Sequence, residues 1–75
     1  MSVKSKNDLK LHRVAINTAN KNELMKLPGI GETTAERIIA FRQENGPFKN
    51  NTELQKVKGI GKKKLEQIKP YLIFN

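Results

Sequence analysis

Two stretches of this chain are versions of one phrase: LPGIGETTAERI at residues 27–38 and VKGIGKKKLEQI at residues 57–68. Working outward from them, a shift of thirty residues aligns further positions on both sides. The aligned pairs include Asn20 with Asn50, Glu23 with Glu53, Leu24 with Leu54, Ala35 with Leu65, Glu36 with Glu66, and Ile38 with Ile68. The chain therefore contains one structural unit twice.

Each unit predicts a helix, a tight turn and a second helix. Asn20 and Asn50 are favourable N-cap residues, and a glutamate three positions after each of them completes a capping-box pattern. We therefore expect two short helices, over about 21–27 and 51–57. Apolar residues at helical spacing predict a longer helix directly after each Gly-Ile-Gly sequence.

Glycine and proline mark where the helices should end. Gly29 and Gly59 follow the short helices, where a C-terminal residue commonly takes positive φ. In the second turn, Gly59 and Gly61 are both expected at a position of positive φ or of close approach by another group. Asn45-Gly46-Pro47 should stop the longer helix of the first unit, and Pro70 should close the last helix.

The pattern predicts an all-α fold with a single small core. The four aromatic residues, Phe41, Phe48, Tyr71 and Phe74, are too scattered for a base-stacking platform, so we expect most of them to serve the core. The other predicted core residues are Ile16, Leu24, Leu27, Ile30, Ala35, Ile38, Ile39, Leu54, Val57, Ile60, Leu65, Ile68 and Leu72.

The composition favours a polyanionic partner. The 75 residues form one small domain with 15 lysines and arginines, 7 acidic residues and a net charge of +8. We divide the chain into a basic, flexible N-terminal arm over 1–13 and a domain over 14–75. Residues 49–69 carry seven lysines and two glutamates, whereas the first phrase is neutral. The two copies therefore cannot contribute equally to binding an anion.

The repeated turn can bind phosphate for a physical reason. It leaves backbone N–H groups unpaired at the start of the second helix, where the helix dipole also favours negative charge. Glycine lets a phosphate approach the backbone, while Ile30 and Ile60 should point inward and anchor each turn, leaving only their backbone for contact. Lysines in the first turn of a helix oppose its dipole, so Lys62, Lys63 and Lys64 suggest that an anion is expected there. The predicted DNA-binding residues are Gly29, Ile30, Gly31, Thr33, Thr34, Gly59, Ile60, Gly61, Lys62, Lys63 and Lys64.

These residues carry a family resemblance. The pattern Leu-x-x-Leu-Pro-Gly-Ile-Gly-x-x-x-Ala-x-x-Ile-Ile, repeated over 54–68, resembles tandem helix-hairpin-helix domains, which form a small orthogonal, SAM-like helical bundle. The resemblance is especially close to the C-terminal DNA-binding domain of ComEA-type bacterial competence proteins. It rests on Ile16-Asn17-Thr18-Ala19, Phe41-Arg42, Asn45-Gly46-Pro47-Phe48 and Ile68-Lys69-Pro70-Tyr71, and it covers residues 14–73.

The resemblance implies double-stranded DNA binding without sequence preference, with hairpin amides on phosphates that flank the minor groove. It also implies that hairpin carbonyls can coordinate a monovalent cation, K⁺ or Na⁺; no other cofactor is expected. The matching carbonyls are those of Met25, Leu27 and Ile30, or of Gln55, Val57 and Ile60. Glu32 departs from the pattern, because it places a carboxylate where a phosphate would approach the first hairpin.

Other functions remain open at this point. The acidic residues are dispersed, so we expect no enzyme activity. One alternative is a protein-interaction or structural module, and another is binding of single-stranded DNA or RNA, since a phosphate clamp does not read the sugar. We expect a monomer that serves DNA uptake, repair or recombination. No signal-like or membrane-spanning apolar run is present, so we expect a soluble protein, cytoplasmic or, if it is a processed competence protein, extracytoplasmic.

Overall fold

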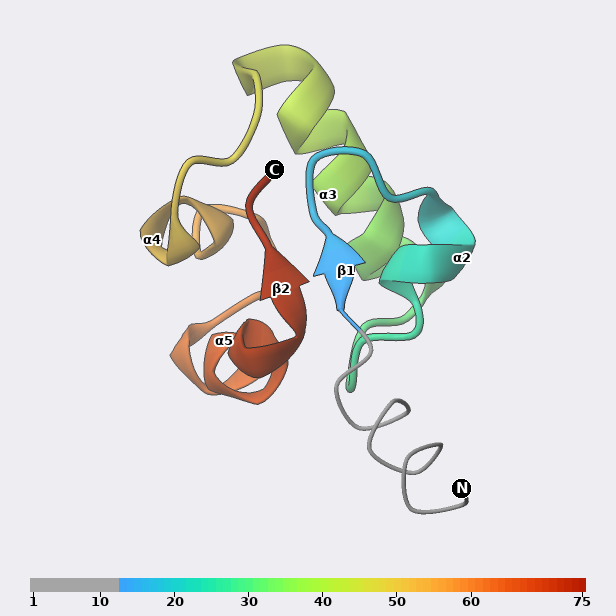
Figure 1. The fold of residues 1–75 in the computed structure, drawn as a ribbon, viewed down its shortest axis with the longest axis vertical. Helices are drawn as coiled ribbons and strands as arrows, with labels where there is room; N and C mark the ends of the chain where they lie inside the picture. Colours follow the sequence, from blue (N-terminus) through green and yellow to red (C-terminus); the bar gives the residue numbers. More distant parts are fainter. Residues whose placement is uncertain (1–12) are drawn as a thin grey trace.

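A computed structural model describes residues 13–75, which form two helical hairpins, the first ending in a long helix (Figure 1). The predicted arm over 1–13 lies outside the described residues, apart from Arg13. The elements in chain order are β1 (Val14–Ala15), α2 (Lys21–Leu24), α3 (Glu32–Asn45), α4 (Asn51–Leu54), α5 (Lys62–Ile68), the 3₁₀ helix η1 (Lys69–Tyr71) and β2 (Leu72–Ile73). The expectation of an all-α tandem helix-hairpin-helix bundle is confirmed.

The first predicted capping box is present and the second is half formed. Asn20 accepts the Glu23 N–H through Oδ1 at 2.9 Å, and the Glu23 carboxylate accepts the Asn20 N–H at 3.2 Å. Asn50 caps Glu53 in the same way at 3.1 Å, but the Glu53 carboxylate accepts the N–H of Lys49 at 2.7 Å. The backbone of Asn50 is more extended, with φ −158° against −84° at Asn20, and this turns a different N–H toward the carboxylate.

The two short helices are shorter than predicted, because α2 ends at Leu24 and α4 at Leu54. Beyond these residues the backbone bonds connect positions three apart. In the first hairpin the Leu27 N–H donates to the Leu24 carbonyl and the Ile30 N–H to the Leu27 carbonyl, both at 3.1 Å. Such bonds give tighter 3₁₀-type turns instead of a continuing α-helix. The second hairpin repeats the pattern.

The glycines of each turn have different conformations. Gly29 and Gly59 have φ of 76° and 103°, as predicted. Gly61 has φ −91° and Gly31 has φ −95°, both extended, so of the two roles expected for Gly61, positive φ is excluded and close approach by another group stays a prediction. Gly31 and Gly61 are instead the N-caps of α3 and α5, which begin at the next residue as expected. Gly46, with φ 89°, ends α3.

The core lies between the two hairpins and follows most of the prediction. Ile39 and Leu72 are corrections, because both are only partly buried. Ile39 follows the fully buried Ile38 on α3, and successive helix residues point in different directions. Val14 and Ala19 are buried although they were not predicted. Phe48 is buried, as expected for most of the aromatic residues, and its ring stacks on Phe41 with centroids 5.0 Å apart.

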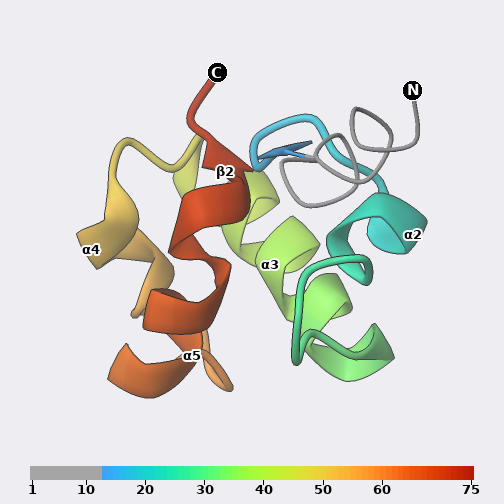
Figure 2. The ribbon, with the colours of Figure 1, turned by 60° about the horizontal axis from the view of Figure 1, so that its bottom comes forward.

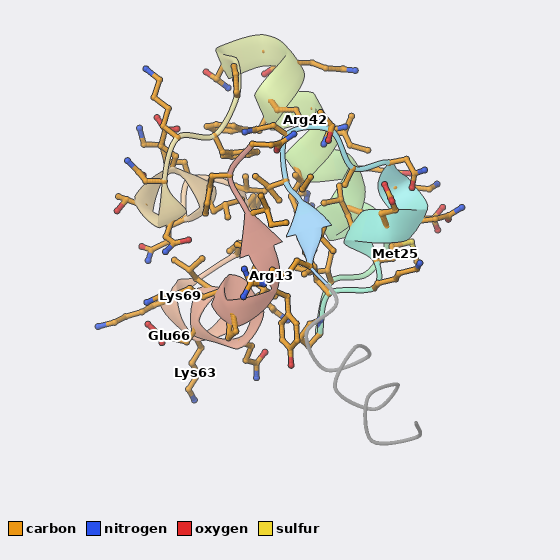
Figure 3. All side chains as sticks on the ribbon, in the orientation of Figure 1. Arg13, Met25, Arg42, Lys63, Glu66 and Lys69 are labelled. Atoms are coloured by element: carbon orange, nitrogen blue, oxygen red, sulfur yellow. The ribbon has the colours of Figure 1, made fainter. Side chains whose placement is uncertain are left out.

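A parallel strand pair that the sequence did not predict joins the two ends of the domain. Val14 pairs with Leu72 and Ala15 with Ile73. The loop after β1 is held on α3 by Arg42, whose guanidinium donates to the carbonyls of Ile16 at 2.8 Å and Ala19 at 2.6 Å (Figure 3). These contacts fix the first hairpin relative to the chain that follows the second.

Candidate nucleic-acid interface

The two hairpin turns gather on one side of the molecule. Figure 2 shows the turn before α3 and the turn before α5 at the bottom of the view, together with the first residues of both helices. The β1–β2 pair and the C-terminus lie at the opposite end. A ligand that lies along this side can therefore reach both turns at once.

Each turn is covered by a residue of the other hairpin. A Cβ placed on Gly29 would lie 2.8 Å from Nζ of Lys64, and the Lys64 ammonium donates to the Gly29 carbonyl at 3.0 Å. A Cβ placed on Gly59 would lie 3.1 Å from Oγ1 of Thr34. Thr34 and Lys64 are thirty residues apart, as Gly29 and Gly59 are. The hairpins are therefore related by an approximate two-fold exchange.

A second pair of side chains follows the same exchange. Nη1 of Arg37 lies 3.6 Å from a Cβ placed on Gly59 and donates to the Lys58 carbonyl at 3.4 Å. Oε1 of Gln67, thirty residues further on, lies 3.5 Å from a Cβ placed on Gly29. The side chains of α3 and α5 thus connect the two turns into one continuous surface.

The start of each long helix offers backbone donors. The first intrahelical bonds are from Ala35 to the Gly31 carbonyl and from Leu65 to the Gly61 carbonyl, both at 2.9 Å. The N–H groups of the three residues before Ala35, and of the three before Leu65, therefore have no intrahelical acceptor. A Cβ on Gly31 or Gly61 would meet no atom of the described residues within 4 Å. Space for an incoming group is thus present beside both N-cap glycines.

The predicted site residues fall into three groups. Ile30 and Ile60 are 4% and 2% exposed, so their side chains anchor the turns as expected. Thr33, Lys62 and Lys63 are exposed, and Figure 3 shows Lys63 pointing away from the protein. Thr34 and Lys64 are half-buried between the two hairpins. The structure brings all of these residues to the side that carries the turns, as shown for the turns themselves in Figure 2.

The two hairpins differ in charge. In the first, Glu32 pairs with Lys21 at 2.8 Å, and Lys21 also lies 3.4 Å from Glu36. The hydrogen bond and charge of Lys21 lower the pKa of the Glu32 carboxyl, and the same hydrogen bond raises the pKa of the Lys21 ammonium. In the second hairpin the positions equivalent to Lys21 and Glu32 hold Asn51 and Lys62, so the negative charge is replaced by a positive one.

Two contributors to this surface were missed from sequence. Lys21 and Arg37 entered only the overall charge count, because nothing local indicates which side chains they meet. The thirty-residue shift pairs Arg37 with Gln67, and both belong to the exchange between hairpins. The shift alone does not show that either side chain reaches the turn of the other hairpin.

Two of the carbonyls predicted to hold a monovalent cation, those of Leu27 and Val57, already accept a backbone hydrogen bond. Leu27 and Val57 accept one N–H each, from Ile30 at 3.1 Å and Ile60 at 3.0 Å, and a carbonyl oxygen can accept more than one partner. Neutral oxygens of this kind suit a hard monovalent cation. Within residues 13–75, no group of three acidic or histidine side chains is arranged to hold a metal ion.

Two successive helical hairpins with their glycine turns on one side of the molecule define a tandem helix-hairpin-helix domain. The helix-hairpin-helix motif matches residues 9–73, and the chain belongs to this family. ComE operon protein 1 of Bacillus subtilis, a ComEA-type protein, is 50% identical over 56 residues, which are 75% of this chain and 27% of that protein.

Two further relatives are similar over nearly the same region. An uncharacterized protein of Haemophilus influenzae is 43% identical over 63 residues, 83% of this chain and 56% of that protein. Human endonuclease/exonuclease/phosphatase family domain-containing protein 1 is 46% identical over 57 residues, 76% of this chain and 10% of that protein. The chain thus corresponds to part of each of these relatives. Together the matches support nucleic-acid binding of the ComEA-like kind.

None of the helices within residues 13–75 has the length and apolar character needed to cross a membrane.

Proposed function

We propose that this protein binds double-stranded DNA through the sugar-phosphate backbone, without sequence preference. The observation that carries the proposal is the shared face of the two hairpins, where uncapped N–H groups and open glycine positions occur twice. Two phosphate sites held at a fixed separation match a polymer backbone better than a single nucleotide. Phosphate contacts position a protein on DNA and carry no sequence information directly.

The second hairpin is the stronger of the two proposed phosphate sites. Lys62 and Lys63 are exposed, and no ion pair involves either of them among residues 13–75. In the first hairpin Glu32 occupies the matching position, and its charge is compensated by Lys21 within the protein. The carbonyls of Met25, Leu27 and Ile30, or of Gln55, Val57 and Ile60, are proposed to hold a K⁺ or Na⁺ ion that supports the turn when DNA binds.

The similarity to a ComEA-type protein favours DNA uptake as the process, with repair or recombination as the alternatives. Because the proposed contacts are to the DNA backbone and not to the bases, they are compatible with uptake, repair and recombination. We further propose that the domain acts as a monomer and approaches the minor-groove side of the duplex.

The proposal is tested by the salt dependence of duplex binding before and after neutralising the second hairpin. For about five to seven phosphate contacts, log affinity should fall with log salt at a slope of about −4 to −6. Changing Lys62, Lys63 and Lys64 together to Gln should flatten this slope by about two to three. Thermal stability should change little, because the removal of three cations from the unfavourable end of the helix dipole offsets the loss of the Lys64 contact with the Gly29 carbonyl.

Fluorescence anisotropy on scrambled duplexes and on matching single strands would supply the measurement. Discrimination among scrambled duplexes by more than about tenfold would contradict backbone binding. Tighter binding to single strands would favour the single-strand alternative. A triple variant that binds duplex DNA as well as the parent, while losing a protein partner, would identify the basic hairpin as a docking face for protein.

A further inference from the structure

The three cations of α2 and α3 have three different environments. Lys21 is paired with Glu32 and Glu36. The guanidinium of Arg42 is half-buried and donates to two backbone carbonyls at 2.8 and 2.6 Å. Arg37 is exposed, and within residues 13–75 no carboxylate lies within ion-pair distance of it. Among these three cations, Arg37 is therefore the one that is exposed and has no carboxylate partner within the described residues.

Arg37 belongs to the first hairpin in sequence but lies at the turn of the second. Its Nη1 donates to the Lys58 carbonyl at 3.4 Å and lies 3.6 Å from a Cβ placed on Gly59. The contact is long for a hydrogen bond, so it orients the side chain without binding it strongly. The guanidinium is thereby directed to the turn that precedes Gly61 and Lys62.

The chemistry of the group suits a phosphate. A guanidinium has five N–H donors in a planar fork and keeps its charge at every physiological pH. One of these donors is directed to Lys58, and the others remain for a ligand. A fork of this kind can donate to two phosphate oxygens at once, whereas a lysine ammonium interacts with phosphate as a point charge.

Resting on the proposed function, we propose that Arg37 contacts the DNA backbone at the turn of the second hairpin, so that this phosphate site is built from both hairpins. Lys64 makes the reciprocal contribution at the turn of the first hairpin, where its ammonium lies on the Gly29 carbonyl. The hairpins then act as one site with shared cations, and neither binds phosphate fully without the other.

The test compares Arg37→Gln with Lys49→Gln in the full chain. Lys49 is also exposed, but it precedes α4, at the opposite end of that helix from the turn. Arg37→Gln should flatten the salt slope of duplex binding by about one, and it should weaken affinity about eightfold at 0.1 M salt. Arg37→Lys should restore the slope, and Lys49→Gln should leave both quantities unchanged. A purely structural role would change thermal stability without changing the slope.

Gln67→Arg gives an independent test that retains Arg37. It places a guanidinium at the equivalent position near Gly29, and it should steepen the slope by about one. The proposal is overturned if Arg37→Gln and Lys49→Gln have the same slope, or if Gln67→Arg leaves the slope unchanged. If the variants fail in this way while the parent protein binds duplex DNA with the expected slope, then the role of Arg37 is wrong and the proposed function stands. A parent without duplex binding would overturn the proposed function itself.

Discussion

Gly59 and Gly61 stand two residues apart in one turn, yet the structure gives them different physical roles. Gly59 has φ 103°, which side-chain-bearing residues rarely adopt, and a Cβ there would lie 3.1 Å from Oγ1 of Thr34. Gly61 has an extended φ of −91° and open space where its Cβ would be. The fold therefore requires glycine at position 59, whereas the fold does not require it at 61, where the proposed phosphate contact would use the open space.

One substitution at both positions separates folding from binding. Gly59→Ser should lower the free energy of unfolding by about 1–2 kcal/mol through backbone strain. Gly61→Ser should leave stability level or raise it, because serine is a better N-cap than glycine. Its hydroxyl would bond to the N–H groups that we assign to phosphate, so duplex affinity should fall about tenfold or more. Chemical denaturation and anisotropy titrations measure the two effects. Unchanged affinity in Gly61→Ser would show that these N–H groups do not contact DNA.

At the level of elements, α2 and the start of α3 are linked by the Lys21–Glu32 ion pair. Both side chains are well exposed, at 38% and 63%, so the pair contributes little to stability. Its larger consequence is electrostatic, because it places a carboxylate at the beginning of α3 and occupies the ammonium of Lys21. The first hairpin is thus made a weaker anion site by a contact within its own repeat.

Glu32→Gln should therefore tighten duplex binding and steepen its salt slope, because Lys21 is released and a repulsive charge is removed. The same substitution has a signature in acid. Lys21 lowers the pKa of the Glu32 carboxyl in the folded protein. The ion pair therefore stabilises the folded state at pH values above the ordinary glutamate pKa of about 4.3, and this stabilisation is lost as the pH falls through the lowered pKa. The melting temperature of the parent should therefore decrease more between about pH 5 and 3 than the melting temperature of Glu32→Gln. Weaker duplex binding by the variant would contradict the assignment.

For the whole molecule, local features were predictable and distant contacts were not. The N-cap at Asn20, the positive φ of Gly29 and the inward Ile30 follow from neighbours in sequence, and all three are confirmed. The pairing of Val14 with Leu72 joins opposite ends of the chain, and no local preference specifies it. Likewise, the thirty-residue repeat predicts two similar hairpins but not that Lys64 lies on the turn of the other one. The place of Arg37 beside the turn of the second hairpin was missed for that reason.

Asn17 provides a test of whether this long-range closure is separate from the binding face. Its side chain accepts the Phe48 N–H at 2.6 Å and donates to the carbonyls of Phe48 at 3.0 Å and Asn75 at 3.2 Å. Asn17→Ala leaves the part-buried Phe48 groups without these partners, so the free energy of unfolding should fall by about 1–3 kcal/mol. Asn75→Ala removes only two exposed side-chain contacts, with the Asn17 N–H and with the Thr18 hydroxyl, and should cost less.

The two variants should nevertheless bind duplex DNA like the parent when they are folded. The loop that contains Asn17 lies at the end of the molecule opposite the hairpin turns in Figure 2, and the turns are held together by contacts of their own. Denaturation curves would give the stability change, and anisotropy at low temperature would give the affinity of the folded protein. Closure of the chain ends stabilises the helical bundle, whereas the exchange of side chains between α3 and α5 sets the spacing of the two turns. If folded Asn17→Ala bound DNA several-fold more weakly, then the spacing of the turns would depend on the closed chain ends, and this division of roles would be wrong.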